Sequence, residues 1–348
     1  MKRIQTVLGY ILPEELGVTM MHEHLLWDQS VYQSSIDPDS NEGRFVYSRI
    51  VPENMKKIRS YNLHKHRDNA KQYDFDEAAD EVIYLKEAGG SSLVDCGCLG
   101  IEERNVEAKQ FISKKTGINV IMATGMYFKG SCPEVENMSF REKTDMFVRE
   151  LTEGVGETKV KAGVIGEIGI SGGFPDCEKQ TLAAAACAQN ETGAAILIHQ
   201  PGLNKTGHHI IDVVEDNGGS LERTVLCHCD PMCDDIEYLQ RLLSRGVNLS
   251  FDQFGIEAYL PSSIGKGIWL PRDIDRIRAI SRLCELGYYK QLVLSQDLCF
   301  KICYIKNGGG GYAHILNNIL PIMKIEGIRE EAIEYMLVKN PARILAME

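Results

Sequence analysis

The stretch GVTMMHEHLL, residues 17–26, contains a short apolar run that ends in the tripeptide His22-Glu23-His24. An apolar run of this length predicts a buried strand over residues 17–22. Residues two apart on a strand point to the same face, so both imidazoles can hold one cation through their ring nitrogens. An open doubly wound sheet, which is the alternative fold, would normally carry a glycine-rich dinucleotide loop after its first strand. The histidines that stand there instead favour a barrel.

Seven further apolar runs follow along the chain. They lie at residues 92–96, 119–125, 162–167, 194–199, 224–228, 247–252 and 291–297. Amphipathic stretches separate them, among them 75–88, 140–153, 179–192 and 274–286, and in the first of these Ala78, Val82 and Leu85 fall at helical spacing. Strands that are apolar throughout and alternate with helices predict a parallel sheet covered by helices. Eight such strands close into a barrel. We therefore predict an α/β fold, a single (β/α)8 TIM barrel domain over residues 1–348.

One segment interrupts this rhythm, from Trp27 to Gln72, where the chain is polar and rich in turn residues. Because it follows the first strand, it must leave from the C-terminal face of the barrel, where barrel active sites are built. Two interpretations stay open: a surface excursion with one or two helices, or a lid over the site. The segment contains a second His-x-His, His64-Lys65-His66, which we expect to be solvated because no strand surrounds it.

The composition limits the function classes. The 348 residues suit one barrel, and 44% apolar with 25% charged residues is typical of a soluble globular protein. The net charge of −11 argues against nucleic acid or an anionic membrane as partner. No segment approaches the roughly 20 apolar residues of a membrane span, and the N-terminus lacks a signal-peptide core. Eleven scattered cysteines, an odd number, indicate reduced thiols in a cytoplasmic protein.

Ionisable residues end four of the later runs. Glu167, His199, His228 and Asp297 each stand at the predicted C-terminal end of a strand, as His22 does. Burying so many ionisable groups without a partner would be costly, and metal ions are a natural compensation. Nitrogen and oxygen ligands suit Zn, Mn, Co or Fe(II). The sequence therefore predicts a metal site at the C-terminal rim of the barrel.

Cysteines also lie at these strand ends. Cys96 and Cys98 end the second strand, and Cys227 and Cys229 flank His228. A thiolate there could reach a metal, and Cys98 is then the candidate, but buried inert thiols are the expected state.

Two residues are candidates for substrate binding. Tyr127 follows the third strand and can line the pocket or simply pack. Lys301, four residues beyond Asp297, can bind an anionic substrate group or stand as a solvated loop lysine.

With these motifs in place, the chain resembles the phosphotriesterase family of the amidohydrolase superfamily, in particular its phosphotriesterase-related branch. The matching stretches are TVLGYILPEELGVTMMHEHLL at the start, AGVIGEIG, ILIHQPG and VLCHCD in the middle, and LVLSQD, GGGGYAHILNNILP and NPARILA near the end. The resemblance spans nearly the whole chain.

The resemblance implies two divalent ions, zinc first and Mn, Co or Fe as alternatives. His22, His24 and Asp297 would hold the more buried ion, and His199 and His228 the more exposed one. The founding branch bridges its ions with a carboxylated lysine. Here the matching strand offers Glu167 as in the related-protein branch, and Lys161 stands too early to substitute.

The resemblance also implies an activity. A hydroxide bridging the two ions would attack an ester-type bond of a small molecule, in a lactone, carboxylic ester or phosphoester, with Asp297 taking the proton of the water. The alternatives are an N-acyl amino-acid amidohydrolase on the same centre, a metal-containing binding protein without turnover, and an isomerase or deaminase. Relatives of this kind suggest a homodimer, by analogy alone.

Overall fold

A computed structural model describes residues 2–60, 63–102, 104–202, 204–260 and 267–348. One sheet of eight parallel strands dominates it, in the order β14-β11-β10-β9-β8-β7-β6-β3. These strands are β3 (Thr19–Glu23), β6 (Ser92–Asp95), β7 (Asn119–Thr124), β8 (Val164–Gly169), β9 (Ile196–His199), β10 (Thr224–Leu226), β11 (Asn248–Phe251) and β14 (Leu292–Leu294). Each falls within or close to one of the eight runs that the sequence predicted as strands.

The two edges of the sheet, β3 and β14, meet just beyond the end of β14. The backbone N–H of Asp297 donates to the carbonyl of His22 over 3.1 Å. The backbone N–H of His22 donates to the hydroxyl of Ser295 over 2.8 Å. These contacts bring the first and last strands together, so the sheet is nearly closed and the predicted TIM barrel is confirmed.

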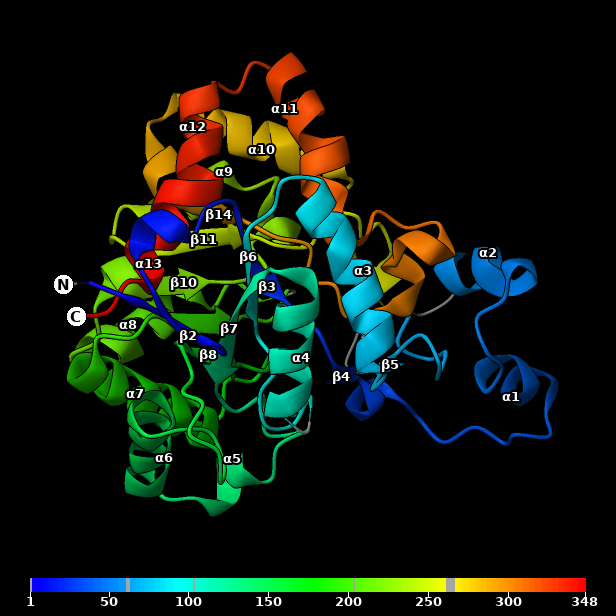
Figure 1. The fold of residues 1–348 in the computed structure, drawn as a ribbon, viewed down its shortest axis with the longest axis horizontal. Helices are drawn as coiled ribbons and strands as arrows, with labels where there is room; N and C mark the ends of the chain where they lie inside the picture. The colour runs from blue at the N-terminus through cyan, green and yellow to red at the C-terminus, as the bar shows by residue number, and fades with distance from the viewer. Residues whose placement is uncertain (1, 61–62, 103, 203, 261–266) are drawn as a thin grey trace.

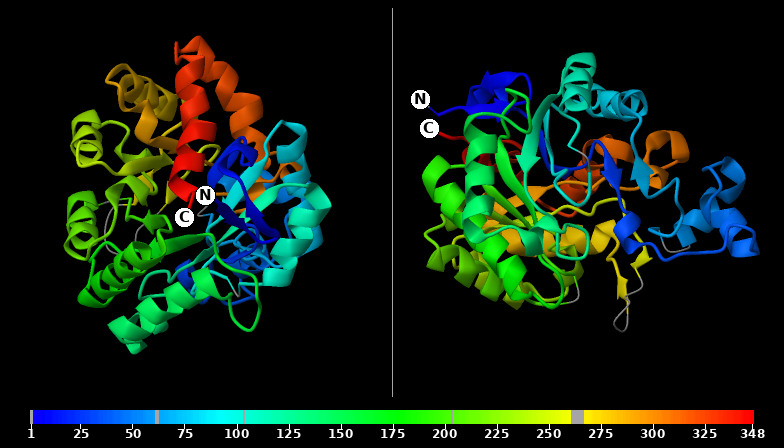
Figure 2. Two further views of the ribbon diagram at one scale, coloured as in Figure 1. Left: turned by 60° about the vertical axis from the view of Figure 1, so that its left-hand side comes forward. Right: turned by 90° about the horizontal axis from the view of Figure 1, so that it is seen from below.

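Helices surround the sheet on its outside, as Figures 1 and 2 show. They are α3 (Phe75–Glu87), α4 (Val106–Thr116), α5 (Glu134–Asn137), α6 (Phe140–Thr152), α7 (Asp176–Thr192), α8 (Gly207–Asp216), α9 (Ile236–Leu243), α10 (Asp273–Glu285), α11 (Leu320–Ile325), α12 (Glu330–Glu334) and α13 (Asn340–Leu345). The four predicted helices are α3, α6, α7 and α10. In α3 the residues Ala78, Val82 and Leu85 are fully buried, as their spacing predicted.

Two hydrophobic cores follow from the alternation of side chains along the strands. Met21, Val94 and Ile121 belong to the core inside the barrel. Their neighbours Met20 and Leu93 belong to the larger core between strands and helices. Near the chain ends the hairpin of β1 (Ile4–Thr6) and β2 (Gly9–Ile11), the turn that follows it and helix α13 add Ile4, Leu16 and Ile344 to the inner core. The inner core thus closes the barrel at the end opposite the site.

The segment inserted after the first strand is closed at its base by a two-stranded ribbon. In that ribbon β4 (Trp27–Asp28) pairs antiparallel with β5 (Lys71–Gln72). Between them α1 (Asn41–Val46) and α2 (Pro52–Ser60) project from the side of the molecule opposite the chain termini (Figure 1). A second excursion, the hairpin of β12 (Tyr259–Leu260) and β13 (Ile268–Trp269), follows β11.

The expectation that His64 and His66 are solvated is wrong. His66 is fully buried, and its Nδ1 accepts the backbone N–H of Asn69 over 3.3 Å. The ring of His64 lies 4.9 Å from that of Phe300, and burial lowers the pKa of His64 to about 4. The inserted segment folds back on the barrel, so both rings find packing that the polar sequence around them did not indicate.

No helix in the described ranges has the length and apolarity that crossing a bilayer requires. All eleven cysteines are free thiols.

Candidate metal centre

The structure brings all six predicted ligands together at the carboxyl ends of the strands. Glu167 lies near their middle. Its Oε1 is 2.9 Å from Nδ1 of His199, 3.1 Å from Nε2 of His228 and 3.4 Å from Nε2 of His22. Three imidazoles from three different strands therefore converge on one carboxylate oxygen.

Asp297 completes the cluster on the side of His22 and His24. Its Oδ1 lies 3.3 Å from Nε2 of His24 and 3.8 Å from Nε2 of His22. Among the other predicted ligands, two sets of three residues offer ligand atoms that all lie within 4.8 Å of one another. One set is His22, His24 and Glu167, and the other is Glu167, His199 and His228. Glu167 belongs to both sets.

Irregularities in two strands aim these side chains. Simple alternation from Met21, which faces the inner core, would turn His22 away from it. The pairing of β3 with β6 shifts register between Met20 and Glu23, and the pairing of β8 with β9 shifts between Ile165 and Ile168. Such bulges redirect side chains near active sites. They allow His22 and Glu167 to meet.

Two of the six residues hold unusual backbone conformations. His228 has φ of +57° and Asp297 has φ of +47°. The left-handed region costs a residue with a Cβ roughly 1–2 kcal/mol. Such strain persists only where surrounding contacts fix it, and it clusters at functional sites.

The electrostatics of the cluster suit cations. His22, His24 and Glu167 are at most 1% exposed. Burial alone would raise the pKa of Glu167, yet the charges and hydrogen bonds of His199, His22 and His228 hold it well below its usual value. Within the described residues, Nε2 of His22 and Nδ1 of His24 are buried without a hydrogen-bond partner. Orphaned imidazole nitrogens around an ionised carboxylate fit divalent metal ions.

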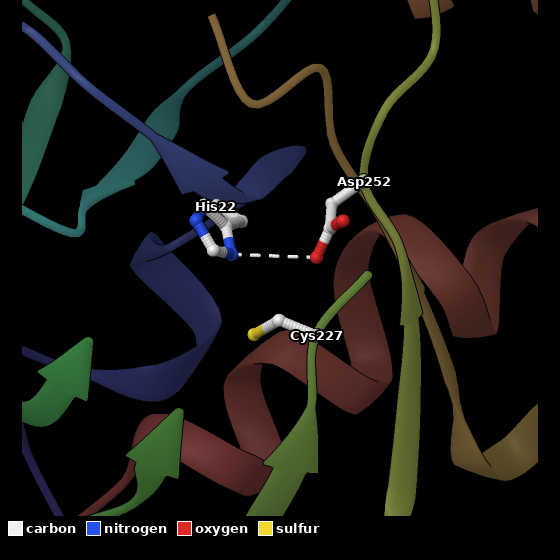
Figure 3. Close-up of side chains that lie close together, drawn as sticks. All are labelled: His22, Cys227 and Asp252. Atoms are coloured by element: carbon white, nitrogen blue, oxygen red, sulfur yellow. Dashed lines mark ion pairs between the residues drawn. The ribbon is translucent and has the colours of Figure 1, made fainter. Parts of the chain in front are cut away.

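Asp252 is a residue of this cluster that the sequence analysis missed. It follows β11, and its Oδ1 lies 2.8 Å from Nδ1 of His228 and accepts the backbone N–H of His228 over 3.0 Å. Its Oδ2 lies 3.3 Å from Nδ1 of His22 (Figure 3). Burial alone would raise the pKa of Asp252, but His228 and His22 lower it below its usual value. One carboxylate thus orients a histidine from each ligand set, as carboxylates behind metal-bound histidines do.

Substituting Asp252 by asparagine is expected to lower the affinity for metal ions by about 10- to 100-fold. The cause is that asparagine lacks the charge that pairs with both imidazoles and replaces one carboxylate oxygen by an N–H donor. Competition with a chelating indicator measures the affinity. Asp80→Asn is the control, because Asp80 is exposed and pairs with Lys115 on the surface. Equal affinities of both variants would show that Asp252 does not orient the ligands.

The cysteine whose sulfur lies beside a candidate ligand is Cys227, not Cys98. Cys227 groups with His22 and Asp252 within 4.8 Å, and Figure 3 shows its thiol turned toward the imidazole. Cys98 instead packs with Ile101 and Tyr127. Burial raises the pKa of both thiols well above the usual value. They stay protonated unless a metal displaces the proton.

Tyr127 reaches the centre through His199. Its hydroxyl lies 3.3 Å from Nδ1 of His199 and 2.7 Å from the hydroxyl of Tyr32. Tyr32 comes from the inserted segment, and its ring lies 4.4 Å from that of His64 and 5.8 Å from that of Phe128. A row of aromatic rings therefore runs from a predicted ligand to the inserted segment.

Lys301 is not brought to this cluster. Its ammonium pairs with Asp68 over 3.2 Å and with Glu77 over 3.5 Å. Its charge therefore fastens the inserted segment and α3 to the loop after β14. Nothing in its contacts places it beside a substrate at the histidines.

The fold and this site define a class of protein: a TIM barrel that presents the donor set of a metal-dependent hydrolase at the carboxyl ends of its strands. The chain belongs to the phosphotriesterase family, a family of metal-dependent hydrolases, and a sequence profile of that family matches residues 2–345. The resemblance drawn from the sequence motifs is thereby confirmed, and the protein is a hydrolase.

The chain is similar to several proteins over nearly its full length. A phosphotriesterase-related protein of Nematostella vectensis is 36% identical, over 97% of this chain and 96% of that protein. An N-acetyltaurine hydrolase of Xenopus tropicalis is 32% identical, over 99% of this chain and 98% of that protein. The crystal structure of a resiniferatoxin-binding protein from Rhodobacter sphaeroides is 34% identical with a TM-score of 0.93, covering 99% of this chain and 94% of that one.

Proposed function

We propose that the protein hydrolyses carboxylic acyl bonds at a centre of two divalent ions, zinc first among the candidates. His22, His24 and Asp297 would hold one ion, His199 and His228 the other, and Glu167 would be shared. The observation that carries this proposal is the membership of Glu167 in both ligand sets. His22 is 0% exposed and His199 19%, which supports a buried and a more accessible ion. When bound, the ions would acidify a water and polarise the substrate's oxygen.

Proton transfer in the proposed reaction is assigned to Asp297. Its side chain is 11% exposed, whereas that of Glu167 is 1% exposed. A carboxylate at the open edge of the cluster can orient the attacking water, accept its proton at Oδ2 and deliver that proton to the leaving group.

The ligands themselves do not choose the bond, because acyl and phosphoryl centres are attacked in the same way. The relatives supply the choice. A protein that is 32% identical over 98% of its length is an N-acetyltaurine hydrolase, and the bond named there is an amide. We therefore propose N-acylated amino or sulfonic acids as the first substrates to test, with carboxylic esters and lactones next and phosphoesters as a side activity.

The inserted segment, residues 27–72, would form one wall of the substrate site. Tyr32 supports this role, since its side chain is anchored to Tyr127 while the residue stays 38% exposed. An aromatic ring open to a pocket can pack on the apolar part of a substrate.

Replacing Tyr32 by alanine is expected to raise KM about fivefold with metal content unchanged, because an aromatic contact is worth about 1 kcal/mol. Steady-state kinetics and metal analysis measure the two quantities. Tyr47→Ala is the matched control, because Tyr47 lies in the same segment and contacts Ile36 and Arg67. If both variants keep the wild-type KM, the segment does not line the site.

An activity panel on metal-reconstituted protein tests the proposed function. It contains N-acyl amino and sulfonic acids, carboxylic esters, lactones with and without a phosphate, and phosphate mono-, di- and triesters. One acyl class should exceed the others by orders of magnitude in kcat/KM. A dominant phosphoester activity would refute the acyl assignment while leaving the centre intact.

A second candidate function, beside hydrolysis, is the binding of a small molecule that the protein does not turn over. The 34% identity to a resiniferatoxin-binding protein favours it. Ligand binding that survives in Asp297→Asn, with no turnover of that ligand by the wild-type protein, would establish this second function.

A further inference from the structure

Glu23 stands between two candidate ligands, and the proposed reaction makes no use of it. It is fully buried, whereas an unengaged glutamate would seek solvent. Its position in the middle of His-Glu-His gives no hint of a role, because the flanking histidines account for the motif.

The carboxylate of Glu23 receives hydrogen bonds from the turn after β14. Its Oε1 accepts from the hydroxyl of Ser295 over 2.6 Å, from the backbone N–H of Gln296 over 2.8 Å and from the amide side chain of Gln296 over 3.0 Å. Its Oε2 accepts from the backbone N–H of Leu298 over 3.1 Å. The residues that Glu23 binds therefore lie on both sides of Asp297.

Asp297 lies between the residues that Glu23 binds, and its backbone conformation needs such support. Asp297 lies in the left-handed region, with φ of +47°. Its own N–H donates to the carbonyl of His22 over 3.1 Å. A buried acceptor that loses its donors costs about 1–3 kcal/mol, so four hydrogen bonds on one buried carboxyl group can hold a turn in a conformation that it would otherwise leave.

A second path closes the network. The amide side chain of Gln296 also donates to the carbonyl of Tyr312 over 2.8 Å, and the hydroxyl of Tyr312 donates to the carbonyl of His24 over 2.7 Å. Thus β3, which supplies His22 and His24, is fastened to the turn that supplies Asp297. The three ligands assigned to the buried ion share one hydrogen-bonded frame, with Glu23 at its centre.

We propose that Glu23 is a positioning residue of the centre, which holds Asp297 in place opposite His22 and His24. The inference rests on the proposed function. Its consequence is that the tripeptide His22-Glu23-His24 supplies two ligands directly and the geometry of a third from the far end of the sequence.

The test compares Glu23→Gln with Glu81→Gln. Glu81 is a matched control, because it is also buried and accepts backbone N–H groups of the loop after β14, from Ile305 over 2.9 Å and Lys306 over 3.1 Å. Those residues lie beyond Asp297 and do not bracket it. For each variant, Zn²⁺ and Co²⁺ titrations against a chelating indicator give the affinities of both ions. Unfolding midpoints of the metal-free proteins, kcat and KM complete the comparison.

Glu23→Gln should lower the affinity for one of the two ions by about 10- to 100-fold and lower kcat with KM retained. The reason is that the glutamine amide turns a donor toward the N–H of Leu298 and releases the turn. Glu81→Gln should lower the unfolding midpoint and keep both affinities. If Glu23→Gln binds both ions as the wild type does, or if both variants lose affinity equally, the proposal is overturned.

If Glu23→Gln yields no folded protein, Gln296→Ala decides, since it removes the hydrogen bond from the Gln296 side chain to Glu23 and leaves the hydrogen bond between Ser295 and His22 in place. If this variant binds one of the two ions more weakly, the proposal is supported. If it binds both ions with wild-type affinity, the proposal is overturned. A wild-type protein that binds fewer than two ions overturns the proposed function and this inference with it. Two ions in the wild type, bound with the same affinities by Glu23→Gln, overturn the inference alone.

Discussion

Asp297→Asn should lower kcat by about 10²- to 10⁴-fold at saturating metal and substrate, which is the usual contribution of a general base. Asparagine keeps the shape of the side chain and an oxygen toward His24, but it cannot accept a proton at neutral pH. Steady-state kinetics on the best substrate of the panel give the ratio. Because the assay uses saturating metal, a lower affinity for the ions does not by itself explain a loss.

The matched control for Asp297→Asn is Asp68→Asn. Asp68 is also a partly buried aspartate near the C-terminal face, and it accepts the backbone N–H of Ile50 and pairs with Lys301. It should retain activity within a few-fold, as changes away from the reacting atoms usually do. An Asp297→Asn protein as active as this control would remove Asp297 from the reaction.

Glu167→Gln should abolish binding of a pair of ions and lower kcat/KM by about 10³-fold or more. The physical reason is the loss of a charge that three imidazoles face: a neutral amide presents an oxygen to at most one side and a donor to the other. Metal analysis after gel filtration and steady-state kinetics measure the two effects. Retention of two tightly held ions would contradict the shared role of Glu167.

Lys161→Ala is the counterpart of that experiment. Lys161 precedes β8 and lines a cavity of about 540 Å³ with Arg3 and Met347, near the chain termini, so it lies at the end of the strand opposite the cluster. Its removal should leave metal content and activity unchanged. A loss of both ions in Lys161→Ala would favour a carboxylated lysine over Glu167.

The sequence predicted the barrel because each strand is a nearly unbroken apolar run, and it predicted the ligand set because those residues end such runs. His199 and His228 needed no tertiary information to be found. Lys161 was placed correctly on the same ground, since strand direction fixes which end of β8 faces the site.

Other parts of the site depend on contacts that a sequence does not display. Asp252 also ends an apolar run, but its role appears only when β11 lies beside β10 and His228 turns into the left-handed region. The bulges in β3 and β8 decide which residues face inward, and no turn residue marks the one in β3. The burial of His66 and the contact of Tyr32 with Tyr127 depend on how a polar segment folds back across the rim.

Metal stoichiometry tests the central claim most directly. The protein is stripped with a chelator, reconstituted with Zn²⁺, Mn²⁺ or Co²⁺, and analysed for ions per chain alongside kcat/KM for the best acyl substrate. A binuclear centre requires two ions per chain, with activity rising as the second ion binds. Full activity with one ion or none would contradict a binuclear centre built around Glu167.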